Sequence, residues 1–147
     1  VCKMYTIEQI AEIRRVAHEA GLNAPDGFWS ASYEDLRQIC NGIGADWQSD
    51  KTRAVLTRAC ACVEATAAIH DFEYHNAILS EKAQKDADDR FLLNGIKETL
   101  HKSRSILSLK FVWNTRKVLL AYCVLRRLGS LAWASSFYNK QLTKGEK

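Results

Sequence analysis

The stretch IHDFEY at residues 69–74 is the most informative part of the chain, because it combines a histidine, a carboxylate and a tyrosine within one predicted helix. Residues four apart lie on the same face of a helix, whereas neighbours point about 100° apart. We therefore expect His70 and Tyr74 on one face and Asp71 on another. A base that titrates near neutral pH, beside a carboxylate that can hold a cation, suits metal-assisted hydrolysis. A purely structural pair within a helix is the alternative interpretation.

Side chains at helical spacing extend this helix over about residues 51–78. They recur at steps of three and four residues: Leu56, Cys60, Val63, Ala67, His70 and Tyr74. This stripe places His70 on the buried side. A second helix is predicted to start after Ser80 and to cover about residues 81–102. A short connection between two long helices produces an antiparallel pair, which would bring Asp88 back toward His70.

Three further helical segments are predicted around this pair. A capping box at Thr6 opens an N-terminal helix that Gly21 is placed to end, and a short helix follows over residues 32–39. The C-terminal region, residues 105–141, is predicted to be helical with a break at Gly129. Its inward-facing residues are expected to be Ile106, Leu109, Val112, Trp113, Leu120 and Val124.

The fold class that follows is all-α, in one domain covering residues 1–147. Its motif-bearing core is expected over about residues 32–100, and its basic helical part over about residues 103–141. The chain has only one proline among 147 residues, which fits long uninterrupted helices. No apolar run in the sequence approaches the roughly 20 residues that a membrane span needs.

Positive charge is concentrated in the C-terminal third. Residues 101–147 carry ten Lys and Arg against one acid, about +9, whereas residues 1–100 carry eleven against sixteen acids, about −5. A basic surface attracts anionic lipid headgroups or nucleic-acid phosphates. A solvated helix face is the other explanation. No nucleic-acid-binding motif accompanies the charge, so nucleic acid is not favoured as a partner.

The five cysteines indicate a reduced protein. Cys60-x-Cys62 fits no zinc-binding spacing, and an odd cysteine count is not typical of a full disulfide framework. We expect Cys40, Cys60, Cys62 and Cys123 to be small, semi-buried residues of a protein held together by its core. This favours a cytoplasmic location, while export after removal of a leader stays open.

Three motifs in order resemble the phospholipase A2 superfamily. They are the glycine-containing ICNGIGAD at residues 39–46, HD-x-x-Y at residues 70–74, and AD-x-x-F at residues 87–91. The likeness covers about residues 36–94 and is greatest to the divergent, disulfide-poor members found in phage and prophage sequences. Ala67 stands where secreted members carry a bridging cysteine.

This resemblance implies a calcium site. Calcium binds carboxylate and backbone carbonyl oxygens together. The Asp71 carboxylate and the carbonyls of Cys40, Gly42 and Gly44 match the family's ligands. Ala45 follows where the family usually has a third glycine, and 25 residues separate Gly44 from His70, more than in the common secreted enzymes.

The resemblance also implies a catalytic arrangement for hydrolysis of the sn-2 ester of phospholipids. His70 would be the general base that activates a water molecule. Asp88 would hold the far imidazole nitrogen, and Tyr74 would hold Asp88 in turn. The N–H of Gly42, together with calcium, would stabilise the oxyanion.

Two functions from different classes remain open on the sequence. The first is a calcium-dependent phospholipid hydrolase of phage or mobile-element type, acting at a membrane surface with anionic headgroups. Aromatic residues among Lys and Arg are its candidate docking groups, or else core residues: Phe111, Trp113, Trp133 and Phe137. The second is a non-catalytic helical structural or interaction protein that retains the same fold. The sequence leaves the oligomeric state undefined.

Overall fold

The computed structural model of the chain describes residues 5–40, 61–76, 78 and 80–145. Every regular element within these ranges is helical, and none is a strand. The predicted all-α class is confirmed. No helix in the described ranges combines the length and apolar character needed to cross a membrane.

The N-terminal layer consists of α1 (Ile7–Glu19), α2 (Asp26–Ser30) and α3 (Tyr33–Ile39). The predicted capping box forms at Thr6, whose side chain accepts from Gln9 N while the Gln9 side chain bonds back. After α1 the backbone turns at Gly21 with φ +61°, a left-handed conformation that glycine adopts without a steric cost. Ser32 caps α3, as its sequence predicts.

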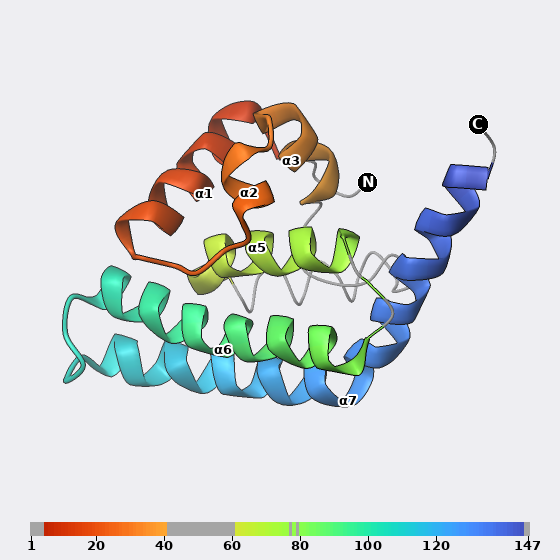
Figure 1. Ribbon diagram of the computed structural model, residues 1–147. Helices are drawn as coiled ribbons and strands as arrows, with labels where there is room; N and C mark the ends of the chain where they lie inside the picture. Colours follow the sequence, from red (N-terminus) through yellow and green to blue (C-terminus); the bar gives the residue numbers. More distant parts are fainter. Residues whose placement is uncertain (1–4, 41–60, 77, 79, 146–147) are drawn as a thin grey trace.

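A pair of helices that run in opposite directions forms the centre of the molecule (Figure 1). They are α5 (Glu64–His75), which follows the single 3-10 turn η1 (Ala61–Val63), and α6 (Glu81–Ser103). The predicted span of α6 is confirmed within a residue, whereas the helix predicted to end near residue 78 ends at His75. Its predicted first part, residues 51–60, lies outside the described residues.

A buried carboxylate from α6 caps the start of α5. Val63, the N-cap residue of α5, makes no capping bond with its own side chain. Glu98 of α6, which is fully buried, accepts hydrogen bonds from Ala65 N at 3.2 Å and from Thr66 N at 2.8 Å. It also accepts from the Thr66 hydroxyl at 2.8 Å and pairs with Lys102 at 2.7 Å. The first turn of α5 is thus fixed by its neighbour, because orphan N–H groups need an acceptor.

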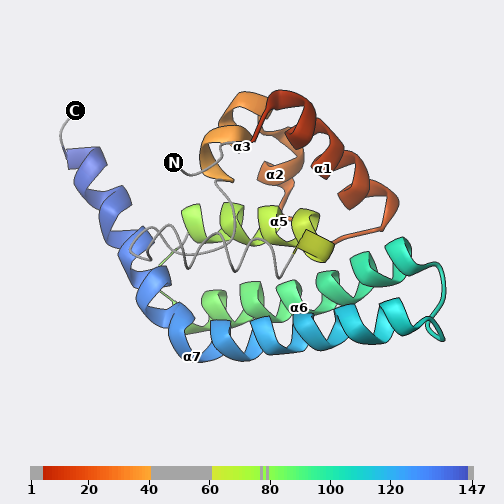
Figure 2. The same cartoon turned by 180° about the vertical axis from the view of Figure 1, so that it is seen from behind.

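The main apolar core lies between the N-terminal layer and α5 (Figure 2). Phe28 of α2 is fully buried and meets Phe72 of α5 edge to face at 5.7 Å. Cys40, at the end of α3, is buried as well, and its thiol lies 3.4 Å from the carbonyl oxygen of Ala68. These contacts hold α2 and the end of α3 against the helix that carries residues 69–74.

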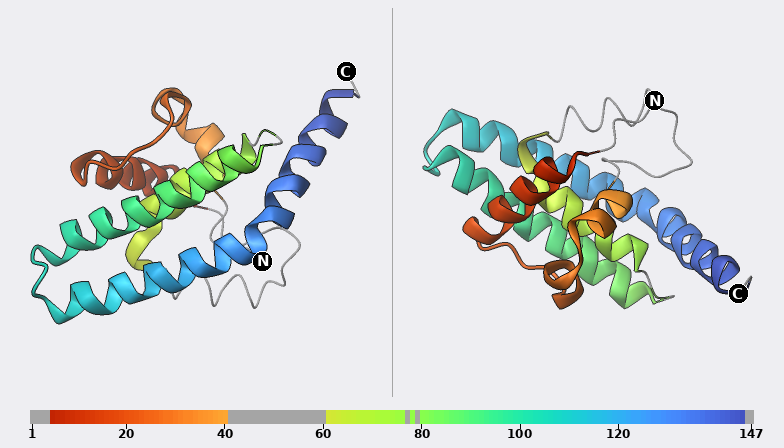
Figure 3. Two further views of the ribbon diagram at one scale, coloured as in Figure 1. Left: turned by 60° about the horizontal axis from the view of Figure 1, so that its bottom comes forward. Right: turned by 90° about the horizontal axis from the view of Figure 1, so that it is seen from above.

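The C-terminal region differs from its prediction in being one helix, α7 (Leu109–Gly145), that continues through Gly129. A Cβ atom at Gly129 would lie 2.6 Å from the Tyr74 hydroxyl, and one at Gly95 of α6 would lie 2.6 Å from a Val118 methyl carbon. These glycines therefore allow close approach between helices. Figure 3 shows the first part of α7 running beside α6.

The predicted inward face of α7 is wrong. The six residues expected inside are 48–87% exposed: Ile106, Leu109, Val112, Trp113, Leu120 and Val124. Val118 and Asn114 are buried instead, with Ala121 and Leu125 packed against the same small cluster. Because α7 is apolar on both faces, hydrophobic periodicity alone does not select the side that packs on α6.

Candidate functional site

His70 of α5 and Asp88 of α6 form a buried pair. The imidazole Nε2 lies 3.0 Å from Oδ1 of Asp88, within the hydrogen-bonding range expected from the antiparallel arrangement. The exposed fraction is 6% for His70 and 0% for Asp88, so the pair is almost completely removed from solvent. A carboxylate only accepts, so Nε2 carries the hydrogen and Nδ1 is left as an acceptor.

Aromatic rings hold the imidazole in place. The ring of Tyr74 lies 4.3 Å from that of His70 at a tilt of 36°, and Phe91 meets it edge-on at 5.2 Å. The Tyr74 hydroxyl also donates to Oδ1 of Asp88 at 2.9 Å. Because His70 and Tyr74 are four residues apart on α5, both side chains can form hydrogen bonds with the same oxygen of Asp88.

Arg126 is a member of this network that the sequence did not reveal. Its Nη1 donates to Oδ2 of Asp88 at 3.1 Å, from α7. Both oxygens of the buried carboxylate are therefore bonded, Oδ1 to α5 and Oδ2 to α7. Arg126 is followed by Arg127, and no local feature of the sequence indicates which of the two residues contacts Asp88. The packing of α7 on α6 decides it.

The electrostatics keep Asp88 ionised. Burial alone would raise its pKa, but the hydrogen bonds from His70, Tyr74 and Arg126 outweigh burial and hold the pKa below its ordinary value. Burial and the neighbouring Asp88 charge raise the pKa of Tyr74, so its hydroxyl stays a neutral donor. Asp88 is thus a charged acceptor with three donors around it.

A second charged pair lies beside the dyad. Arg90 of α6 binds Glu73 of α5, whose side chain is only 9% exposed. Burial raises the pKa of Glu73 to about 7, and the Arg90 charge offsets only part of that effect. One Glu73 oxygen, Oε2, is buried without a hydrogen-bond partner within the described part of the chain.

Asp71 lies on a different side of α5 from His70, as its position in the helix predicts. Burial and the Asp71 charge together raise the pKa of the Cys40 thiol. Burial, with Glu64 and Asp71, likewise raises the pKa of the Tyr5 hydroxyl. The Asp71 charge therefore acts on the Cys40 thiol, and the sequence assigns both residues to a calcium site.

Asp71 and Cys40 carry donor types that suit calcium, because a carboxylate and a main-chain carbonyl are oxygen donors of the kind that calcium binds. Gly42 and Gly44, the other assigned ligands, lie outside the described residues. Among the residues described, no group of three or more His, Cys, Asp or Glu side chains is placed to hold a metal.

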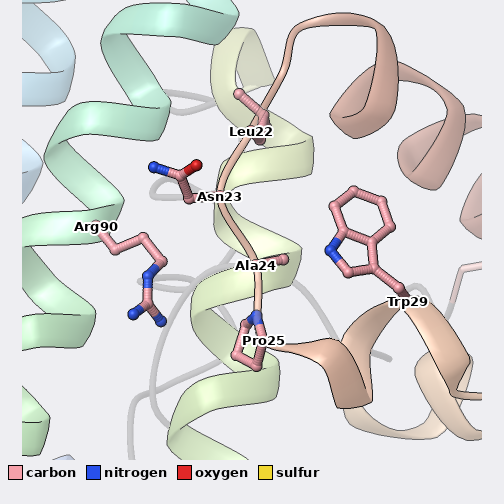
Figure 4. A pocket seen from close by; sticks show the side chains of 6 residues that line it. All are labelled: Leu22, Asn23, Ala24, Pro25, Trp29 and Arg90. Carbon is pink, nitrogen blue, oxygen red and sulfur yellow. The ribbon is translucent and has the colours of Figure 1, made fainter.

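A hollow of about 480 Å³ opens beside the second charged pair (Figure 4). It is lined by residues 22–25 together with Trp29 and Arg90. Asn94 holds this segment to α6, accepting from Asn23 N at 2.8 Å and donating to Asn23 O at 2.7 Å. Neither member of the buried dyad lines this hollow.

Comparisons of the chain with protein-family models, with curated proteins and with solved structures find no match.

Proposed function

We propose that the protein is a calcium-dependent hydrolase of the sn-2 ester of phospholipids, a divergent phospholipase A2-like enzyme of phage or mobile-element type. The observation that carries this proposal is the His70–Asp88–Tyr74 constellation. Three residues from two separate motifs of the resemblance meet at hydrogen-bonding distance. The antiparallel helices α5 and α6 supply the framework that such a site requires.

His70 is the proposed general base. Asp88 holds Nε2–H, so Nδ1 is free to take a proton from water as the water oxygen attacks the ester carbonyl. The protonated ring then returns that proton to the leaving alkoxide, which departs as the lysophospholipid. Tyr74 keeps Asp88 in the orientation that fixes this tautomer.

The calcium ligands in this proposal are the Asp71 carboxylate and the carbonyls of Cys40, Gly42 and Gly44. The effect of the Asp71 charge on the Cys40 thiol supports assigning these two residues to one site. When bound there, calcium would supply positive charge beside the ester carbonyl, and the Gly42 N–H would donate a hydrogen bond to the same oxygen.

An anionic membrane surface is the proposed partner. The outer face of α7 exposes apolar side chains next to cations: Val112 at 59%, Trp113 at 60% and Leu120 at 61%, with Arg116 and Arg127 also exposed. Lipid headgroups and acyl chains satisfy both kinds of group, whereas a nucleic acid would leave the apolar ones uncovered. Phe111 is half-buried, and the side chains of Trp133 and Phe137 lie outside those described.

The test is fatty-acid release from vesicles of mixed zwitterionic and anionic phospholipid, with calcium and with a chelator. Wild type should release fatty acid only with calcium. His70→Gln should lower the rate by about 10²–10⁴-fold, as loss of a positioned base does. His75→Gln, an exposed histidine of the same helix, is the matched control and should keep the wild-type rate. Activity that survives the chelator, or persists in His70→Gln, contradicts the proposal.

One observation favours the second candidate, a non-catalytic helical structural or interaction protein. The dyad is 0–6% exposed, so in this conformation the residues act as a buried polar link between α5 and α6. In that case, wild type with calcium should show no ester hydrolysis, while His70→Gln should still lower the melting temperature because it leaves Asp88 under-bonded.

A further inference from the structure

We propose that Arg126 is a positioning residue of the dyad: by holding Oδ2 of Asp88, it keeps Oδ1 aligned with His70 and so fixes which imidazole nitrogen carries the hydrogen. The mechanistic consequence rests on the proposed function, whereas the effect on the imidazole does not. Arg126 itself touches Asp88 and not the imidazole, and it acts on the proposed base through that carboxylate.

The first reason to assign a positioning role to Arg126 is the way the hydrogen-bond donors are divided between the two oxygens of Asp88. Oδ1 of Asp88 accepts from His70 Nε2 and from the Tyr74 hydroxyl, while Oδ2 accepts from Arg126. A carboxylate can rotate about its Cβ–Cγ bond, and a strong donor on the second oxygen resists that rotation. With Arg126 in place Asp88 is fully buried, so these three donors are its shield from solvent.

The packing of α7 is the second reason. Gly129 follows Arg126 by three residues, so both lie on one face of α7. A Cβ atom there would be 2.6 Å from the Tyr74 hydroxyl and 3.3 Å from Gln84 Nε2. Tyr122, four residues before Arg126, donates to Oδ1 of Asp89 at 2.8 Å. One face of α7 thus meets Asp88 through Arg126 and Tyr74 through Gly129, and Tyr122 fixes the same face to the neighbouring Asp89.

Charge around the carboxylate is the third reason. Burial raises the pKa of Glu73, which is paired with Arg90, and the Asp88 charge adds to that rise. Tyr74 on α5 is a neutral donor. Lys85 of α6 is bound to Asp89. Within the described residues, Arg126 is the cation that directly contacts Asp88.

The experiment measures the imidazole of His70 by NMR in the full chain, without lipid and at one pH of about 8.5, where an ordinary imidazole is neutral. The readouts are the ¹⁵N shifts that report the tautomer and the exchange rate of the Nε2 hydrogen. Arg126→Gln is compared with Arg127→Gln. Arg127 is the next residue along α7 and its side chain is exposed, so this control removes an equal charge without touching Asp88. Arg126→Lys, which keeps a charged donor, tests rescue.

Wild type, Arg127→Gln and Arg126→Lys should show one tautomer with a slowly exchanging Nε2 hydrogen. Arg126→Gln should show a mixture of tautomers and exchange at least about 10-fold faster. An unchanged imidazole in Arg126→Gln overturns the inference. If Arg126→Gln does not fold, Arg126→Met, which keeps the apolar stem, is measured by the same criteria.

Turnover separates this inference from the proposed function. With vesicles and calcium, Arg126→Gln should lower kcat by about 10–100-fold with KM unchanged, since misplacement of a base affects the chemical step. An altered imidazole in a protein with no wild-type turnover upholds the positioning role and refutes the hydrolase. Wild-type turnover that Arg126→Gln leaves unchanged refutes the positioning role and leaves the hydrolase standing.

Discussion

Replacing Glu98 by alanine should be among the most destabilising single changes in the chain. The carboxylate accepts from two main-chain N–H groups in the first turn of α5 and from the Thr66 hydroxyl, all in a buried site. Without it these donors have no acceptor, and Lys102 keeps only its bond to the Cys62 carbonyl. Each buried donor left unsatisfied costs about 1–3 kcal/mol, so the two N–H groups together give about 4 kcal/mol. That is a large fraction of a typical domain stability of about 5–15 kcal/mol.

The assay is urea unfolding followed by circular dichroism. Glu98→Ala should lower the free energy of unfolding by about 4 kcal/mol and the melting temperature by on the order of 10 °C. Thr66→Ala, which removes only the hydroxyl donor, should cost about 1 kcal/mol. Asp86→Ala, an exposed acid on the same helix, is the control and should stay within about 0.5 kcal/mol of wild type. A loss below about 1 kcal/mol for Glu98→Ala would refute the idea that α6 caps α5.

Further predictions concern pH, packing and redox state. The pKa of Glu73 in the folded protein is about 7 against an ordinary 4.5, so the free energy of unfolding should fall by up to about 3 kcal/mol as pH rises from about 4.5 to 7. In unfolding curves measured across this pH range, Glu73→Gln should remove that fall. The same pH dependence in Glu73→Gln and wild type would count against this prediction. Gly95→Ala should cost about 1–3 kcal/mol in urea unfolding through its clash with Val118, and adding Val118→Ala should recover part of it; equal stability of Gly95→Ala and wild type would disprove this contact. Cys40 and Cys123 are free, so melting temperatures with and without reductant should coincide; a drop of many degrees on reduction would point to bridges and export.

Local signals in the sequence predicted the part of the fold that holds the dyad. Ser80 accepts from Ala83 N and starts α6 at the expected place. The spacing of His70 and Tyr74 placed both on the face that meets α6, and the short connection brought Asp88 to them. These features depend on helix geometry and capping over a few residues, which a single sequence carries.

Contacts between helices distant in the chain were not predictable. The outer and inner faces of α7 are both apolar, so burial on α6 followed from Gly95 and Val118 rather than from periodicity. Gly129 led us to expect a break in the helix, but α7 is continuous there. The absence of a side chain at Gly129 instead lets α7 approach Tyr74 closely. The prediction that the cysteines are semi-buried was only partly right. Cys62 is half-buried, but Cys40 is buried and Cys123 is exposed.

The most direct test of the proposed site is a calcium titration by calorimetry on three proteins: wild type, His70→Gln and Asp71→Asn. Calcium takes oxygen ligands, so wild type and His70→Gln should bind it with similar affinity, while Asp71→Asn should not bind. Circular dichroism without calcium should show that all three proteins are folded at the temperature of the titration. No binding by wild type at millimolar calcium, or equal binding by Asp71→Asn, would contradict a calcium site at Asp71 and with it the calcium-dependent hydrolase.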